Sequence, residues 1–145
     1  MVTAGQGVDM TDEKIFISNL NDATWNQHGP ERIAIGANPD LRFCYLVDSN
    51  LHQSHGLSVG CLVIPAGGEL PPHIHAPQEV YFIKSGCGLM LMANDQTRAV
   101  TADDVVYIPP GEEHGLKNNG DVPLEIIWMF PTDSWKEIDY TYLDR

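Results

Sequence analysis

The sequence predicts an all-β chain, folded in one domain as a sandwich or barrel of antiparallel strands. Its 145 residues suit about one domain. Thirteen glycines and ten prolines argue against a helical bundle, because both residue types disfavour helix interiors. Short apolar segments alternate with turn-forming residues, and no stretch keeps the apolar period of an amphipathic helix.

The predicted strands begin at about position 41. Each apolar segment ends at residues such as Asp48-Ser49-Asn50 or Pro109-Pro110-Gly111, which favour turns because Asn and Gly tolerate positive φ and Pro presets φ. In chain order the apolar segments are Phe43–Val47, Leu57–Ile64, Val80–Ile83, Leu89–Ala93, Val105–Ile108 and Leu124–Phe130. We therefore expect the barrel to comprise residues 41–131, with a C-terminal tail at 132–145.

The N-terminal extension, residues 1–40, has no clear pattern. Its isolated apolar side chains, such as Ile15, Trp25 and Ile35, suit an edge strand or a swapped segment. We expect the extension to pack either on its own barrel or on a partner subunit.

The charge of the chain excludes several kinds of partner. Eight Lys and Arg residues stand against 20 Asp and Glu, a net charge of −12 spread along the whole sequence. Such a chain repels nucleic acid and anionic membranes. No cluster of basic residues is present to hold a multiply anionic substrate. The expected ligand is therefore neutral.

The spacing of the cysteines and the length of the apolar runs indicate the cellular location of the protein. Cys44, Cys61 and Cys87 are far apart and form no CxxC pair, which favours a reducing environment. No basic segment followed by an apolar one stands at the N-terminus, and the longest apolar runs, such as Ile126–Phe130, are too short to cross a membrane. We expect a cytoplasmic protein.

Two histidines and a glutamate suggest a metal site. His73 and His75 are two residues apart, so on a strand both side chains point to one face and can converge on one ion. The prolines at 71, 72 and 77 keep this segment out of a helix. Glu79 can rejoin the same face on the next strand and offer a carboxylate oxygen.

His114 opens the strand that follows the Pro110-Gly111 turn, and it can complete the coordination from the facing sheet. Three imidazoles and one carboxylate suit zinc, iron, manganese or nickel, and leave two positions of an octahedron open. His52 and His55 precede a barrel strand and could supply a further imidazole. Glu79 would then be free to act as a general base.

These residues resemble the two motifs of the cupins, a family of small β-barrel proteins. The first motif, G-x5-H-x-H-x3,4-E-x6-G, matches residues 67–86 at every specified position. The second, G-x5-P-x-G-x2-H-x3-N, matches residues 103–118, except that Asp103 replaces the first glycine at a turn that Asp also makes.

The resemblance covers about residues 41–131 and implies a jelly-roll barrel that forms a homodimer. It also implies that the metal ligands are His73, His75, Glu79 and His114. In length and motif placement the chain is similar to the small cupin cyclases of aromatic polyketides in the resistomycin and tetracenomycin pathways.

An apolar pocket is expected beside the metal. Glu125 should face water, so alternation sends Ile126, Trp128 and Phe130 inward. Tyr81 and Ile83 share the parity of Glu79, and Met90 and Met92 are candidate liners. Leu70 lies beside the first metal-bearing strand, and Gly60 would leave room for the substrate. Such a pocket suits a neutral, apolar or aromatic molecule.

Three functions follow from these features. The first is a cyclase or lyase in which the metal, zinc by preference, acts as a Lewis acid on a ketone or enol oxygen, with aldol-type ring closure and loss of water. The second is a non-haem dioxygenase that uses iron, manganese or nickel. The third is a barrel that binds or senses a ligand without catalysis.

Overall fold

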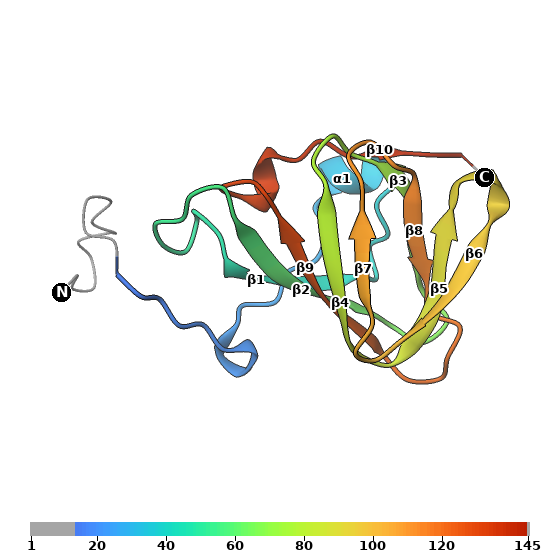
Figure 1. Cartoon of the computed structure of the whole chain (residues 1–145), viewed down its shortest axis with the longest axis horizontal. Helices are drawn as coiled ribbons and strands as arrows, with labels where there is room; N and C mark the ends of the chain where they lie inside the picture. Colours follow the sequence, from blue (N-terminus) through green and yellow to red (C-terminus); the bar gives the residue numbers. More distant parts are fainter. Residues whose placement is uncertain (1–13, 145) are drawn as a thin grey trace.

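Two five-stranded antiparallel sheets face each other in the computed structural model, which describes residues 14–144 (Figure 1). In spatial order the first sheet contains β1 (Arg42–Val47), β2 (Ser58–Ile64), β9 (Leu124–Phe130), β4 (Glu79–Ser85) and β7 (Val105–Ile108). The second contains β10 (Thr141–Tyr142), β3 (Glu69–Ile74), β8 (His114–Lys117), β5 (Cys87–Met92) and β6 (Thr97–Thr101). The prediction of an all-β, single-domain chain is confirmed.

All six predicted apolar segments coincide with strands of the structure. Four strands lie outside those segments: β3, β6, β8 and β10. Strand β3 contains Pro71 and Pro72, which have no backbone N–H, and its pairing with β8 shifts register between Leu70 and His73. The irregular pairing places His73 directly opposite His114.

The inward face of β9 follows the predicted alternation. Burial alternates along the whole strand, and Ile126, Trp128 and Phe130 are all buried in the core. Glu125 points to the other side, where its carboxylate accepts hydrogen bonds from Ser85 and Lys84. The core therefore lies between the two sheets, and the site described below lies inside it.

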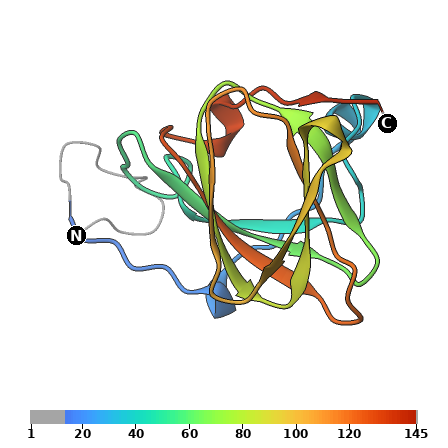
Figure 2. The same ribbon diagram turned by 45° about the vertical axis from the view of Figure 1, so that its right-hand side comes forward.

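The two flanking segments meet at one end of the barrel (Figure 2). A short helix, α1 (Pro30–Ala34), carries Arg32, whose guanidinium lies 4.3 Å from the centre of the Trp135 ring and donates a hydrogen bond to the Ile138 carbonyl. Three-residue 3-10 helices lie at Leu20–Asp22, Ala93–Asp95 and Trp135–Glu137. The tail thus packs on the barrel and adds β10 to the second sheet.

The N-terminal extension contacts its own barrel through Asn26, which forms a β-bridge with Phe43. Residues 1–13 of the extension lie outside the described residues, and a swapped contact with a partner subunit stays a prediction. Over residues 14–144, no helix combines the length and apolar character that crossing a bilayer requires. The three cysteines are free thiols; Cys44 and Cys61 are buried, and Cys87 is exposed.

Candidate metal centre

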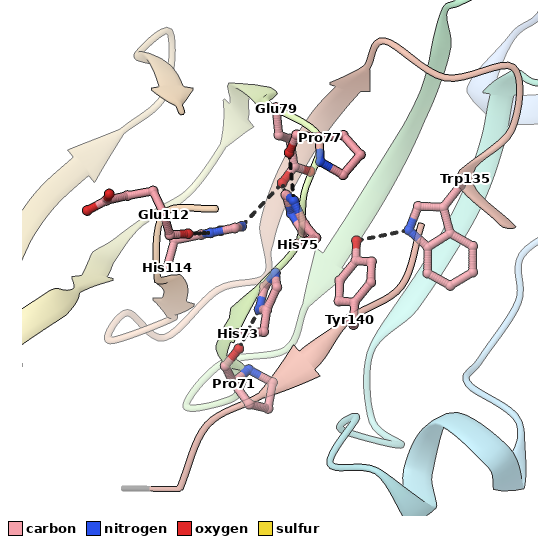
Figure 3. Close-up of polar contacts among 9 residues, drawn as sticks. All are labelled: Pro71, His73, His75, Pro77, Glu79, Glu112, His114, Trp135 and Tyr140. Atoms are coloured by element: carbon pink, nitrogen blue, oxygen red, sulfur yellow. Dashed lines mark hydrogen bonds and ion pairs between the residues drawn. The ribbon is translucent and has the colours of Figure 1, made fainter. Parts of the chain in front are cut away.

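Three buried histidines converge inside the barrel. His73 lies in β3, His75 follows that strand, and His114 begins β8; each is at most 2% exposed. One ring nitrogen from each lies within 4.8 Å of the other two. Figure 3 shows the imidazoles approaching one another from the two strands. Because β3 pairs with β8, residues about forty positions apart in the sequence meet at one point.

Each of the three imidazole rings is oriented by a hydrogen bond of the same kind, from its Nδ1 to a backbone carbonyl. The Nδ1 atoms of His73, His75 and His114 lie 2.7, 2.8 and 2.8 Å from the carbonyl oxygens of Pro71, Pro77 and Glu112. A carbonyl only accepts, so Nδ1 carries the proton in all three rings. Each Nε2 therefore presents a lone pair, which is the form of imidazole that binds a metal.

Glu79 supplies a carboxylate beside two of these nitrogens. It begins β4 and is 3% exposed, and its Oε1 lies 3.1 Å from His75 Nε2 and 3.3 Å from His114 Nε2. Lone pairs on nitrogen and oxygen at these distances repel each other unless a cation lies between them. His114 Nε2 is also buried without a hydrogen-bond partner. The residues present therefore fit a divalent metal ion.

Burial keeps His73 neutral. Desolvation, followed by the neighbouring His114, lowers the pKa of His73 well below its ordinary value of 6.5. A neutral imidazole binds a metal without first releasing a proton.

The lowered pKa of His73 predicts how the stability of the metal-free chain depends on pH. Below about pH 6.5 the unfolded chain takes up a proton on His73 that the folded chain does not. The free energy of unfolding therefore falls by up to about 1.4 kcal/mol for each unit by which the pH is lowered. Urea unfolding in chelator between pH 7.5 and 5.5 measures this slope. His73→Gln should flatten it, whereas His55→Gln, at an exposed histidine, should not. An unchanged slope in His73→Gln contradicts the prediction.

The structure places neither additional histidine in this cluster, which corrects the expectation of a fourth imidazole. The ring of His52 stacks on Phe16, with centroids 3.9 Å apart. Exposed His55 lies 3.1 Å from the side-chain nitrogen of Gln53. Both belong to the loop between β1 and β2, and their neighbours come from that loop and the N-terminal extension.

A small cavity of about 30 Å³ adjoins Glu79, one of the four candidate metal ligands. Glu79 lines it together with three residues predicted for the pocket: Leu70, Tyr81 and Trp128. Burial, and then the charge of Glu79, raise the pKa of Tyr81 well above its ordinary value, so Tyr81 keeps its proton and can donate it in a hydrogen bond. The wall of the cavity is mostly aromatic.

Three other predicted pocket residues have different roles. Ile126 and Phe130 are buried in the core and do not line this cavity. A side chain at Gly60 would overlap the ring of Trp128 and the carbonyl of Cys44. The space beside Gly60 is therefore filled by Trp128 and is not left for a substrate, which corrects that expectation.

Met90 and Met92 face a second, larger cleft of about 610 Å³. The cleft opens between β5–β6 and β7, and it is also lined by Arg98, Ile108 and His114. Ile83, the other candidate liner, is fully buried in the core.

Sequence reasoning missed four of the residues that line the small cavity. His28 comes from the N-terminal extension, and Trp135, Tyr140 and Tyr142 come from the tail. Stacking brings the ring centroid of Tyr140 within 4.8 Å of the centroid of His73, at an interplanar angle of 20°. The concentration of aromatic residues in the tail was the available signal.

Comparisons with known proteins agree with this arrangement. A family model described as the cupin domain matches residues 60–130. An uncharacterized protein of Methanocaldococcus jannaschii is 34% identical over 83 residues, which are 57% of this chain and 66% of that protein. Germin-like protein 5-1 of Oryza sativa is 36% identical over 80 residues, 52% of this chain and 36% of that protein. The chain thus matches only part of the length of these relatives.

The fold also agrees with solved structures. The polyketide cyclase RemF from Streptomyces resistomycificus superposes with a TM-score of 0.72, covering 91% of this chain and 89% of that one at 14% identity. A double-stranded β-helix protein from Klebsiella pneumoniae gives 0.62 at 18% identity, covering 75% and 89%. Together with the family match and the two facing sheets, these likenesses show that the chain belongs to the cupin superfamily.

Proposed function

We propose that this cupin is a metal-dependent enzyme whose ion is held by His73, His75 and His114, with Glu79 as the fourth ligand. The observation that carries the proposal is the arrangement of lone pairs: three oriented Nε2 atoms and a carboxylate oxygen face one another in a buried site. Zinc is the first candidate; iron, manganese and nickel suit the same ligands.

A divalent ion in this site would act as a Lewis acid on a substrate carbonyl or enol oxygen. The protein's own residues supply the remaining parts. Glu79, which lines the cavity, would hold the ion through Oε1, the oxygen that lies 3.1 Å from His75 Nε2. Tyr81 keeps its hydroxyl proton and hydrogen-bonds to Glu79, and this contact orients the carboxylate. The aromatic wall limits contact of the carboxylate with bulk water.

The cavity favours a neutral, apolar substrate. Among the described residues that line it, aromatic side chains dominate and neither lysine nor arginine is present. Cyclisation of an aromatic polyketide is the narrower form of the proposal. Its support is the aromatic wall, since the likeness to RemF at 14% identity concerns the fold. The substrate of such a reaction would have to displace aromatic side chains of the tail.

Elemental analysis of freshly purified, untagged protein tests the proposal. We expect about one divalent ion per chain, as three oriented imidazoles and a carboxylate retain metal through purification. Zinc favours Lewis-acid chemistry and directs assays to ketone substrates. Iron, manganese or nickel favours the dioxygenase alternative and directs them to oxygen uptake. A chain that holds no metal, even after incubation with each of these ions, contradicts the proposal and leaves the ligand-binding alternative.

A further inference from the structure

We propose that the cleft beside Met90 and Met92 holds the body of the substrate, and that Arg98 donates a hydrogen bond to an oxygen at the substrate's far end. This inference rests on the metal site proposed above and adds the substrate class. The molecule would be a neutral aromatic compound that offers one oxygen to the ion and a carbonyl or phenolic oxygen at its opposite end. Arg98 lies between the two cupin motifs, which assign it no role.

The pairing of the strands places Arg98 on the same inner surface as a candidate metal ligand. Strands β8, β5 and β6 are neighbours in the second sheet (Figure 1). His114 lies opposite Met92 in the β5–β8 pair, and Arg98 lies opposite Met90 in the β5–β6 pair. Met90 and Met92 are two residues apart on one strand, so all four side chains share one face. Val100, two residues beyond Arg98, is buried in the core, and this face therefore points inward.

The same register sets the length of a molecule that can reach both ends of the cleft. His114 and Arg98 are two strands and two residues apart. With strands about 4.8 Å apart and a rise of about 3.4 Å per residue, their Cα atoms lie about 12 Å from each other. The Arg98 side chain spans part of this distance. A ligand with two fused rings is therefore long enough to lie between an ion at His114 and the guanidinium.

The cleft also has the room that the small cavity lacks. Its volume of about 610 Å³ falls within the range of about 300–1,000 Å³ that is usual for ligand pockets. The small cavity of about 30 Å³ holds about one water molecule. A fused-ring molecule bound there would have to displace aromatic side chains of the tail, whereas the cleft is already open. The thioethers of Met90 and Met92 make favourable contacts with aromatic rings.

The charged groups of the cleft favour a neutral oxygen over a carboxylate at the far end. Asp104, Glu112 and Glu113 line the cleft together with one guanidinium, so an anionic ligand meets more negative charge than positive. Within residues 14–144 the exposed Arg98 forms no ion pair with any of these carboxylates. Its N–H groups are therefore available to donate to a carbonyl or phenolic oxygen of a ligand.

The methionine methyl groups test where the ring system binds, without an activity assay. The zinc-loaded chain, labelled with ¹³C at the methionine methyls, is titrated with 2-naphthohydroxamate, whose hydroxamate group binds the metal. Ring currents of the naphthalene should shift the Met90 and Met92 signals by more than their linewidths. The Met129 signal should not move, because that side chain lies on the outer face of β9 and does not line the cleft. Single Met→Leu variants assign the signals.

The affinity of the cobalt-loaded chain tests the role of Arg98. The ligand 6-hydroxy-2-naphthohydroxamate adds one phenolic oxygen to 2-naphthohydroxamate, and the visible cobalt spectrum reports both Kd values. In the wild type the hydroxylated ligand should bind about five- to tenfold tighter, the effect of one hydrogen bond from a charged donor. Arg98→Met, which keeps the apolar length of the side chain, should abolish the difference without weakening 2-naphthohydroxamate.

Arg42→Met is the matched control, because Arg42 is exposed on β1, where its guanidinium lies 5.4 Å from the centre of the Trp25 ring. It removes one guanidinium that does not line the cleft, and it should keep the difference between the two ligands. The fold of each variant is checked by circular dichroism. If Arg98→Met does not fold, Arg98→Gln provides the same comparison.

The outcomes separate this inference from the metal site. If 2-naphthohydroxamate binds and the Met90 and Met92 signals stay in place, the ring lies outside the cleft and the inference is overturned, while the metal site stands. The same holds if the metal-loaded chain binds acetohydroxamate but not 2-naphthohydroxamate. Equal affinity of the wild type for the two naphthyl ligands, or a difference that persists in Arg98→Met, overturns the role of Arg98. Failure of the wild-type chain to take up zinc or cobalt overturns both proposals.

Discussion

Replacing His73 and His114 together by alanine should lower the metal content from about one ion per chain to below about 0.1. The two histidines face each other across the β3–β8 pair, and each presents Nε2 to the same point. Removing both leaves His75 and Glu79, and two protein donors rarely hold a divalent ion through gel filtration. Elemental analysis after saturation with metal measures the loss.

The chain offers a control of matched composition. His52→Ala with His55→Ala also removes two imidazoles, from a loop whose histidines contact Phe16 and Gln53, and it should keep the full metal content. His73→Gln with His114→Gln preserves most of the side-chain volume and serves if the alanine variant unfolds. Full metal retention by a folded His73/His114 variant would show that the ion is bound elsewhere.

Gly60→Ala should destabilise the chain by about 3 kcal/mol or more, at the upper end of what overpacking costs. A methyl group at this position overlaps the Trp128 ring and the carbonyl of Cys44 on the neighbouring strand. Trp128 is 5% exposed and Gly60 lies opposite it in the β2–β9 pair, so neither can move aside without disturbing a central strand. Urea unfolding monitored by tryptophan fluorescence measures the change.

Gly29→Ala is the control for this substitution, since a methyl group there meets nothing within 4 Å. Its effect should stay within about 0.5 kcal/mol. If Gly60→Ala is as stable as the wild type, the space beside Gly60 is open and the original expectation of room for a substrate is restored.

The strands differ in how well local sequence predicts them. Strands such as β2 and β9 are long apolar segments bounded by turn residues, and the chain pattern alone locates them. Strand β6 has the largely polar sequence TRAVT, and β10 has only two residues. Both are strands because they hydrogen-bond to β5 and β3. A strand that is held by its pairing, and not by its own apolar residues, leaves no local signal in the sequence.

In the candidate site, too, local sequence predicts some features and the fold alone sets others. Residue type and spacing single out His73, His75, Glu79 and His114, because few other chain patterns place such donors two, four and several tens of residues apart between turn glycines. The tautomer of each ring, in contrast, depends on a backbone carbonyl whose position the fold sets.

The sequence by itself therefore determined the β class, the metal-binding residue types and the apolar character of their surroundings, since these follow from local spacing and alternation. Only the tertiary structure decided that Trp128 fills the space at Gly60 and that Tyr140 of the tail stacks on His73. Side-chain packing between segments far apart in sequence depends on shape in three dimensions. A pattern of residue types along the chain does not contain that information.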